Sequence, residues 1–273
     1  MKKNIFVLTS LMLTLGCGCD SFLDETNYSD VTSEGGYYDT EAGLNAVVNA
    51  CYTPLRFWAG KEDAIGLSET GTDIIAAGSG CVDNNMAAYT QSLDGTNSAC
   101  TFYFDRFYAA INWCNTAIFH AQTVPNPSND EILATTLNKR EAEARVLRTF
   151  YYWILTETFG DTYYTDQPST SIVMNPVKTS TDNIYQYMFD DLDWAIKSKL
   201  STLQNDGGRV TIWTAKALKA RLLLTRASEK NDVDMYGQAY DLAKDVIENG
   251  PFELAEDFAS IWDMKNSDGR SEE

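Results

Sequence analysis

Apolar side chains recur at helical spacing in six stretches of the chain, separated by segments rich in Gly, Pro or polar residues. In the first stretch, Leu44, Val47, Val48 and Cys51 fall on one face of a helix. No stretch alternates convincingly between apolar and polar residues, as a half-buried strand does. The sequence therefore predicts an all-α fold, with helices near residues 40–55, 102–124, 129–159, 182–200, 211–227 and 236–249.

The stretch 129–159 has the strongest helical pattern, because its C-terminal half is apolar around most of its circumference. Such a helix must be buried between neighbours on several sides. Gly160 follows it directly and is the residue type that commonly ends a helix. In the next predicted helix, Asp182 is placed to cap the N-terminus.

Residues 60–100 interrupt the helical pattern with Gly, Ser, Asn and Asp and only short apolar patches. We interpret this segment as a long irregular insertion, and long ordered loops are usually functional. Residues 19–39 are polar, contain Gly35-Gly36, and are predicted to be a tether with little structure. The predicted helical domain therefore covers residues 40–273, with the insertion at about 60–100.

The last helices are predicted to pair as stacked antiparallel hairpins. Ala239, Ala243 and Val246, followed by Pro251, match the small-residue pattern in the second helix of a tetratricopeptide unit. A stack of such units exposes an extended protein-binding face. Because the spacing between the units is irregular, generic helix packing without true repeats stays open as the alternative.

The first 18 residues have the pattern of an export signal. Lys2 and Lys3 precede an apolar stretch, residues 5–15, which is too short to span a bilayer and has the length of a signal-peptide core. Cys17 and Cys19 follow, each after a glycine, as in a bacterial lipoprotein cleavage site. Either cysteine could carry a lipid, which would be the only membrane attachment. Cleavage as a plain secretory signal is the alternative.

The composition excludes several classes of function. Of 273 residues, 21 are Lys or Arg and 39 are Asp or Glu, which gives a formal net charge of −18. A nucleic-acid partner is therefore not expected, because phosphate binding needs a basic face. His120 is the one histidine, so a multi-histidine metal site is excluded and a Ser-His or Cys-His pair could form only there. Its place near the end of a helix allows an interaction with the helix dipole.

Four cysteines follow the leader: Cys51, Cys81, Cys100 and Cys114. Export would place them outside the reducing cytosol, and four cysteines allow three disulfide pairings. Cys81 and Cys100 flank one polar loop and make the simplest pair. Unpaired cysteines that act as small apolar residues are the alternative.

Other side chains with chemical potential have structural explanations. Asp190, Asp191 and Asp193 lack the loop spacing of a calcium site and are predicted to be a solvated acidic face, so no metal or cofactor is expected. Five tryptophans lie at helical apolar spacings or at helix ends and are predicted to be core residues rather than ligand platforms: Trp58, Trp113, Trp153, Trp194 and Trp213.

The acidic residues of the helix 129–159 do not predict an enzyme. Glu141 and Glu143 precede Arg145 and Arg148 by four and five residues, which predicts ion pairs along the helix rather than acid-base chemistry. A glycosidase needs two carboxyl groups about 5–10 Å apart across a cleft. No motif in the sequence points to such a pair.

Five segments, in order along almost the whole chain, resemble the SusD/RagB family of outer-membrane lipoproteins of Bacteroidetes. The first, Cys19-Asp20-Ser21-Phe22-Leu23-Asp24, is similar to the start of the mature family proteins, in which the lipidated cysteine precedes a Phe-Leu-Asp tract. This similarity favours Cys19 as the lipid anchor. The other four segments lie within 68–73, 143–161, 184–195 and 208–247.

The resemblance implies a non-enzymatic protein, lipid-anchored in the outer membrane and exposed at the cell surface. Family members capture oligosaccharides and lid a SusC-like TonB-dependent transporter. They are usually twice as long as this chain, so the resemblance implies that the chain is an N-terminal portion of the SusD-like fold, with the C-terminal half missing. A helical-repeat adaptor that binds only protein is the alternative function.

The insertion supplies the predicted ligand contacts. Sugars present apolar C–H faces and many hydroxyls, so a binder offers flat aromatic rings beside amide and carboxylate groups. The insertion holds such a set within a Gly-rich loop, although an ordinary solvated loop is the alternative. The predicted ligand-binding residues are Asp83, Asn84, Asn85, Tyr89 and Gln91.

Overall fold

The computed structural model of the protein describes residues 37–59, 62–76, 78, 84–126, 128–198, 200 and 208–262. The predicted leader, both candidate lipid anchors, Cys81 and Asp83 lie outside these ranges. Over the described part, no helix is long and apolar enough to cross a membrane. The elements are η2 (Tyr37–Asp39), α2 (Glu41–Tyr52), α3 (Leu55–Ala59), α4 (Glu62–Ser68), α5 (Asn84–Ala88), α6 (Ser98–Thr123), α7 (Glu131–Phe159), β1 (Thr162–Tyr163), β2 (Lys178–Thr179), α8 (Thr181–Lys197), α9 (Ile212–Lys230), α10 (Val233–Asn249) and η3 (Phe258–Trp262).

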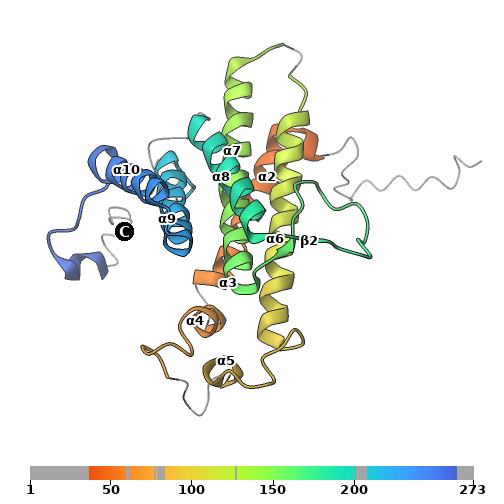
Figure 1. The fold of residues 1–273 in the computed structure, drawn as a ribbon. Helices are drawn as coiled ribbons and strands as arrows, with labels where there is room; N and C mark the ends of the chain where they lie inside the picture. The colour runs from red at the N-terminus through yellow and green to blue at the C-terminus, as the bar shows by residue number, and fades with distance from the viewer. Residues whose placement is uncertain are drawn as a thin grey trace, which may run out of the picture. The chain divides into compact units, whose positions relative to one another are not determined.

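Two long antiparallel helices, α6 and α7, form the centre of the fold (Figure 1). Helix α2 packs against both, α8 packs on α7, and α9 packs on α8 and pairs with α10. The short helices α3, α4 and α5 gather at the end of the central pair where α6 begins and α7 ends (Figure 1). The all-α fold is confirmed, and the antiparallel α9–α10 pair is of the predicted hairpin type.

Local structure corrects three details of the sequence prediction. The insertion is not wholly irregular, because α4 and α5 form within it and bury Ala64 and Met86. Helices this short depend on tertiary packing, which a periodicity pattern cannot register. Ser180, not Asp182, caps α8, since its side chain accepts the N–H of Asn183. Strands β1 and β2, two residues each, pair antiparallel in the connector before α8.

Helix α7 is buried on most of its circumference, as its sequence predicts. It begins at Asp130, whose carboxylate accepts the N–H groups of Ile132 and Leu133. The Tyr151 hydroxyl donates to the Cys51 carbonyl of α2 at 2.6 Å. The Tyr152 hydroxyl donates to a carbonyl of the loop before α8 at 2.8 Å. Backbone groups on two sides of α7 are thus satisfied by its own tyrosines.

A buried ion cluster joins α7 to α8. Nε and Nη2 of Arg148 donate to the two oxygens of Asp191, each at 2.8 Å, and Nη1 donates to Oδ1 of Asn115 on α6 at 2.7 Å. Arg145 binds Asp191 at 2.6 Å and also forms the predicted helix pair with Glu141 at 2.7 Å. Arg148 is 3% and Asp191 6% exposed. The prediction of a solvated acidic face is therefore wrong for Asp191, because two arginines of α7 face it.

A second buried carboxylate, Glu143, fixes α7 against α2 and the segment before α9. It accepts the Tyr52 hydroxyl of α2 at 2.6 Å and Nη1 of Arg209 at 2.7 Å, and it also pairs with Arg140. The predicted pair of Glu143 with Arg148 is wrong, because five residues along a helix place the two side chains on different faces.

His120 holds η2 on α6 rather than acting only on the helix dipole. Its Nδ1 lies 2.8 Å from Oδ1 of Asp39, and the side chain is buried. The rings of Tyr38 and Phe119 pack on the imidazole, with centroids 5.4 and 5.3 Å away. The described body of the protein therefore begins with a segment that is bound to the core.

The first prediction concerns the close approach of η2 to α2. A Cβ on Gly43 would lie 1.8 Å from the Tyr37 carbonyl oxygen. We expect Gly43→Ala to lower the free energy of unfolding by about 1–3 kcal/mol, because η2 must move away. Urea denaturation followed by circular dichroism measures the change.

Gly237 of α10 is the matched control, since no atom lies within 4 Å of its Cβ position. Gly237→Ala is expected to raise the free energy of unfolding by about 0.5–1 kcal/mol through helix propensity alone. A gain in stability from both substitutions would contradict the close approach at Gly43.

The second prediction concerns the ion cluster. Asp191→Asn keeps the side-chain shape but leaves the buried Arg148 charge without a carboxylate, so we expect a loss of about 3–5 kcal/mol in unfolding free energy. Asp190→Asn, on the exposed side of the same turn, is expected to change stability by less than about 0.5 kcal/mol. Equal losses from the two variants would show that the Arg148–Asp191 contact contributes nothing specific.

Candidate ligand-binding site

A cavity of about 360 Å³ lies where α4, α5, the loop after α5, the start of α6 and the end of α7 meet. Ligand pockets in proteins span about 300–1,000 Å³, so this cavity is at the small end of that range. Its described lining is mostly apolar with a few polar groups: Gly66, Leu67, Thr70, Met86, Tyr89, Leu93, Asp94, Gly95, Cys100, Thr158 and Phe159.

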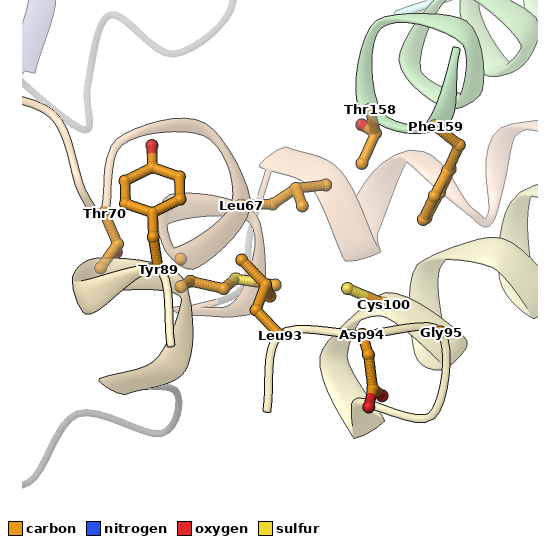
Figure 2. Close-up of a pocket in the computed structure, with 11 residues that line it drawn as sticks. Leu67, Thr70, Tyr89, Leu93, Asp94, Gly95, Cys100, Thr158 and Phe159 are labelled. Carbon is orange, nitrogen blue, oxygen red and sulfur yellow. The ribbon is translucent and has the colours of Figure 1, made fainter. Parts of the chain in front are cut away.

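Figure 2 shows two opposing sides of this cavity. Tyr89 and Leu93 come from the insertion, and Phe159 descends from the end of α7 on the other side, with the Cys100 sulfur below it. Phe159 meets Phe104 of α6 edge to face, with ring centroids 5.5 Å apart. Because α6 and α7 are the central helices, this side of the cavity is built on the most firmly packed part of the fold.

The Tyr89 ring stands at the mouth of the cavity and is 72% exposed. Its backbone φ of +48° is rare for an aromatic residue and costs on the order of 1–3 kcal/mol unless the surroundings enforce it. The ring edge lies on Gly71: a Cβ there would be 3.2 Å from Cε2 of Tyr89 and 2.9 Å from the Met86 carbonyl oxygen. Gly71 itself has a φ of +91°, so a glycine both permits the turn and leaves room for the ring.

A hydrogen-bonded turn places Asp94 and Gly95 in the lining, but Figure 2 shows the Asp94 carboxylate pointing away from Tyr89 and from the cavity. Oδ1 of Asp94 accepts the hydroxyl and the N–H of Thr96 at 2.7 and 2.8 Å. These two bonds hold the pKa of the Asp94 carboxyl below its ordinary value. Asn97 then caps α6 by accepting the N–H groups of Ala99 and Cys100.

Of the predicted ligand residues, Tyr89 lines the cavity. Asn84 and Asn85 lie in the first turn of α5, where Oδ1 of Asn85 accepts the Thr90 hydroxyl at 2.7 Å. Gln91 is exposed in the loop that follows. These three residues are not part of the described lining, and Asp83 lies outside the described residues. That any of them contacts a ligand stays a prediction.

Sequence reasoning missed the apolar lining. Two segments that resemble the family come together at this cavity: Thr70 belongs to the segment 68–73 and Phe159 to the segment 143–161. The sequence pattern could not predict this contact, because the two segments are far apart along the chain. Trp213 is buried, and Trp58, Trp153 and Trp194 pack partly buried against the core, as predicted. Trp113 is the exception, being 39% exposed.

The described lining carries few groups with chemical potential. The described lining contains a single carboxylate, Asp94, whereas glycoside hydrolysis uses two. Within the described ranges, no three His, Cys, Asp or Glu side chains gather in a way that could hold a metal ion. An apolar cavity with an exposed tyrosine beside it suits a ligand that has apolar faces.

The paired helices around a long central pair define a tetratricopeptide-like, all-α class of protein. The chain belongs to the SusD-like family described as starch-binding and associating with the outer membrane, whose model matches residues 72–266.

Relatives of known sequence or structure agree with this family. A SusD-like protein of Bacteroides ovatus is 26% identical over 285 residues, which cover 99% of this chain and 48% of the relative. A solved SusD homolog from Bacteroides thetaiotaomicron has a TM-score of 0.71 at 22% identity, over 84% of this chain and 44% of that chain. A solved laminarin-binding SusD-like protein has a TM-score of 0.63 at 20% identity, over 82% of this chain and 48% of that one. The chain spans about half the length of the relatives it matches.

The third prediction concerns the support of Tyr89. Gly71→Ala introduces a Cβ in a left-handed conformation, at a cost of about 1–2 kcal/mol, and pushes against both the ring and the Met86 carbonyl. We expect the segment 84–97 to loosen and its amides to exchange faster in hydrogen–deuterium exchange mass spectrometry. Gly78→Ala, at a site with no atom within 4 Å, is the control and should leave the exchange unchanged. Unchanged exchange in both variants would contradict the role of Gly71.

Proposed function

We propose that this protein binds oligosaccharides at the cavity beside Tyr89 and does so without chemical catalysis. The observation that supports the proposal most directly is the Tyr89 ring, which is held at its edge by Gly71 and otherwise exposed beside an apolar cavity. A sugar ring would stack its C–H face on this tyrosine. The cavity takes part of the oligosaccharide, and the remaining units extend into solvent.

The energetics of such a site favour weak, reversible capture. Sugar hydroxyls lose water when they bind, so each hydrogen bond yields only about 0.5–1.5 kcal/mol net. Ordering the ligand costs further free energy. A binder that releases its ligand to a second protein gains from this balance, because tight binding would delay the transfer.

The proposed place of the protein is the outer membrane of the cell, at its outer surface, with a lipid on Cys19 as the anchor. The family description, which names association with the outer membrane, and the leader-like pattern of the first 18 residues support this location. In the proposed role the protein delivers its ligand to a SusC-like TonB-dependent transporter. The laminarin-binding relative supports glucans as the first ligands to test.

A second candidate function is a helical-repeat adaptor that binds protein and has no affinity for glycans. Helix α10 favours it, since a row of large apolar side chains on it is exposed: Val233, Tyr236, Tyr240 and Ile247. Exposed apolar rows of this kind mark protein-binding faces. The two candidates differ in whether a sugar binds at all, so one experiment separates them.

The fourth prediction tests the sugar site. Tyr89→Ala removes the platform and is expected to weaken binding of soluble β- and α-glucan oligosaccharides at least tenfold, which corresponds to about 1.4 kcal/mol. Isothermal titration calorimetry with the 273-residue chain measures the change. Tyr240→Ala, which removes another exposed tyrosine, from α10, is the control and should leave the affinity unchanged.

Three outcomes decide between the candidates. Loss of affinity in Tyr89→Ala alone supports the cavity as the sugar site. If both variants bind the sugar as tightly as the unsubstituted chain does, sugar binding does not depend on Tyr89 and the proposed site is wrong. Silence of the chain across a broad glycan panel, together with capture of an outer-membrane barrel that Tyr240→Ala abolishes, favours the adaptor.

A further inference from the structure

Two cysteines from different helices meet in the core. Cys51 is in α2 and Cys114 in α6, and both are 0% exposed. Their side chains interact with each other, and Sγ of Cys51 donates to the Val47 carbonyl oxygen at 3.2 Å. Both side chains are present as thiols in the structure. Nothing in the sugar-binding site uses either group.

We propose that Cys51 and Cys114 form a disulfide that ties α2 to α6 when the chain folds under oxidising conditions. The geometry supports this pair over a pair between Cys100 and Cys114. Those two residues lie 14 positions apart in α6, which separates them by about 21 Å along the helix, whereas a disulfide needs Cα atoms within about 7 Å. Cys51 and Cys114 are on helices that pack together, and their side chains already interact within the core.

The reaction is ordinary thiol–disulfide exchange. The thiolate of one cysteine attacks the disulfide of an oxidant, either an exported oxidoreductase or glutathione disulfide, and releases one thiolate from it. The thiolate of the other cysteine then attacks the mixed disulfide and releases the second. The two cysteines lose two protons and two electrons, and the oxidant leaves as two thiols.

The burial of the pair sets when this reaction can occur. No oxidant disulfide reaches a sulfur atom that is 0% exposed, and the contact with Cys114, followed by burial, raises the pKa of the Cys51 thiol. The folded, reduced chain therefore contains little thiolate and resists exchange. We infer that the bond forms during folding, before α2 docks on α6, and is then shielded from reduction.

The bond would constrain the candidate site. The segment between Cys51 and Cys114 contains α3, α4 and α5 and all the described lining of the cavity except Thr158 and Phe159. Closing this loop limits how far the insertion can move from α6 in partly unfolded states. The inference depends on the proposed export of the chain only for a source of oxidant in the cell.

The test is oxidative refolding. The chain is reduced and unfolded, refolded in a buffer of oxidised and reduced glutathione, alkylated, digested and analysed by mass spectrometry. We expect one linked peptide that joins Cys51 to Cys114 and a melting temperature about 5–15 °C above that of the reduced chain. The Cys51→Ala and Cys114→Ala variants are controls and should lose both the link and the rise.

A second arm tests the shielding: the folded, reduced chain in the same buffer should stay reduced at both positions. Full alkylation of Cys51 and Cys114 after oxidative refolding overturns the proposal, as does linkage of either residue mainly to Cys81 or Cys100. If the refolded chain aggregates, protein secreted into a bacterial periplasm gives the same readout. The oxidant is supplied in the test, so failure here is independent of failure in sugar binding.

Discussion

The buried charges of α7 are the constraint on which the rest of the structure depends. A helix enclosed by neighbours cannot leave Arg148 or Glu143 without a partner, because an unpaired buried charge costs several kcal/mol. Burial alone would lower the pKa of Arg148, but the Asp191 carboxylate outweighs burial and raises it. Arg148 thereby fixes the rotation of α8, and Glu143 fixes Tyr52 of α2 and the segment that precedes α9. The carboxylates of Asp191 and Glu143 thus position three neighbours of α7, namely α8, α2 and the segment before α9.

The same constraint positions the candidate site. Phe159 is at the last turn of α7, so every contact that fixes the helix also fixes one side of the cavity. The opposite side comes from the insertion, where the edge of the Tyr89 ring lies on Gly71 and the side chain is mostly in solvent. Binding proteins commonly place variable loops on a rigid scaffold in this way, because the scaffold provides precision and the loop provides the choice of ligand.

The sequence predicted the helices well, because burial of one face imposes a 3.6-residue period on each of them. It could not show that Asp191 is buried, since three neighbouring aspartates look like a solvated face until α7 supplies two arginines 43 and 46 residues away. The short helices α4 and α5 were missed because tertiary contacts, rather than local pattern, stabilise them. Tyr89 was predicted as a ligand contact from its residue type, but its support on Gly71 depends on positive backbone angles at both residues, which no periodicity encodes.

The residues that fix the fold differ from those of the proposed site. Most segments that resemble the family contain the arginines and carboxylates of the α7 network, such as Arg148, Asp191 and Arg209, and these residues are engaged in packing. These residues are therefore evidence for the fold, and they carry no information on the ligand. Within the segments that resemble the family, Thr70, Thr158 and Phe159 line the cavity and Gly71 supports Tyr89 beside it. In the proposed site, ligand choice would therefore depend on the side chains of the insertion, which take no part in the α7 network.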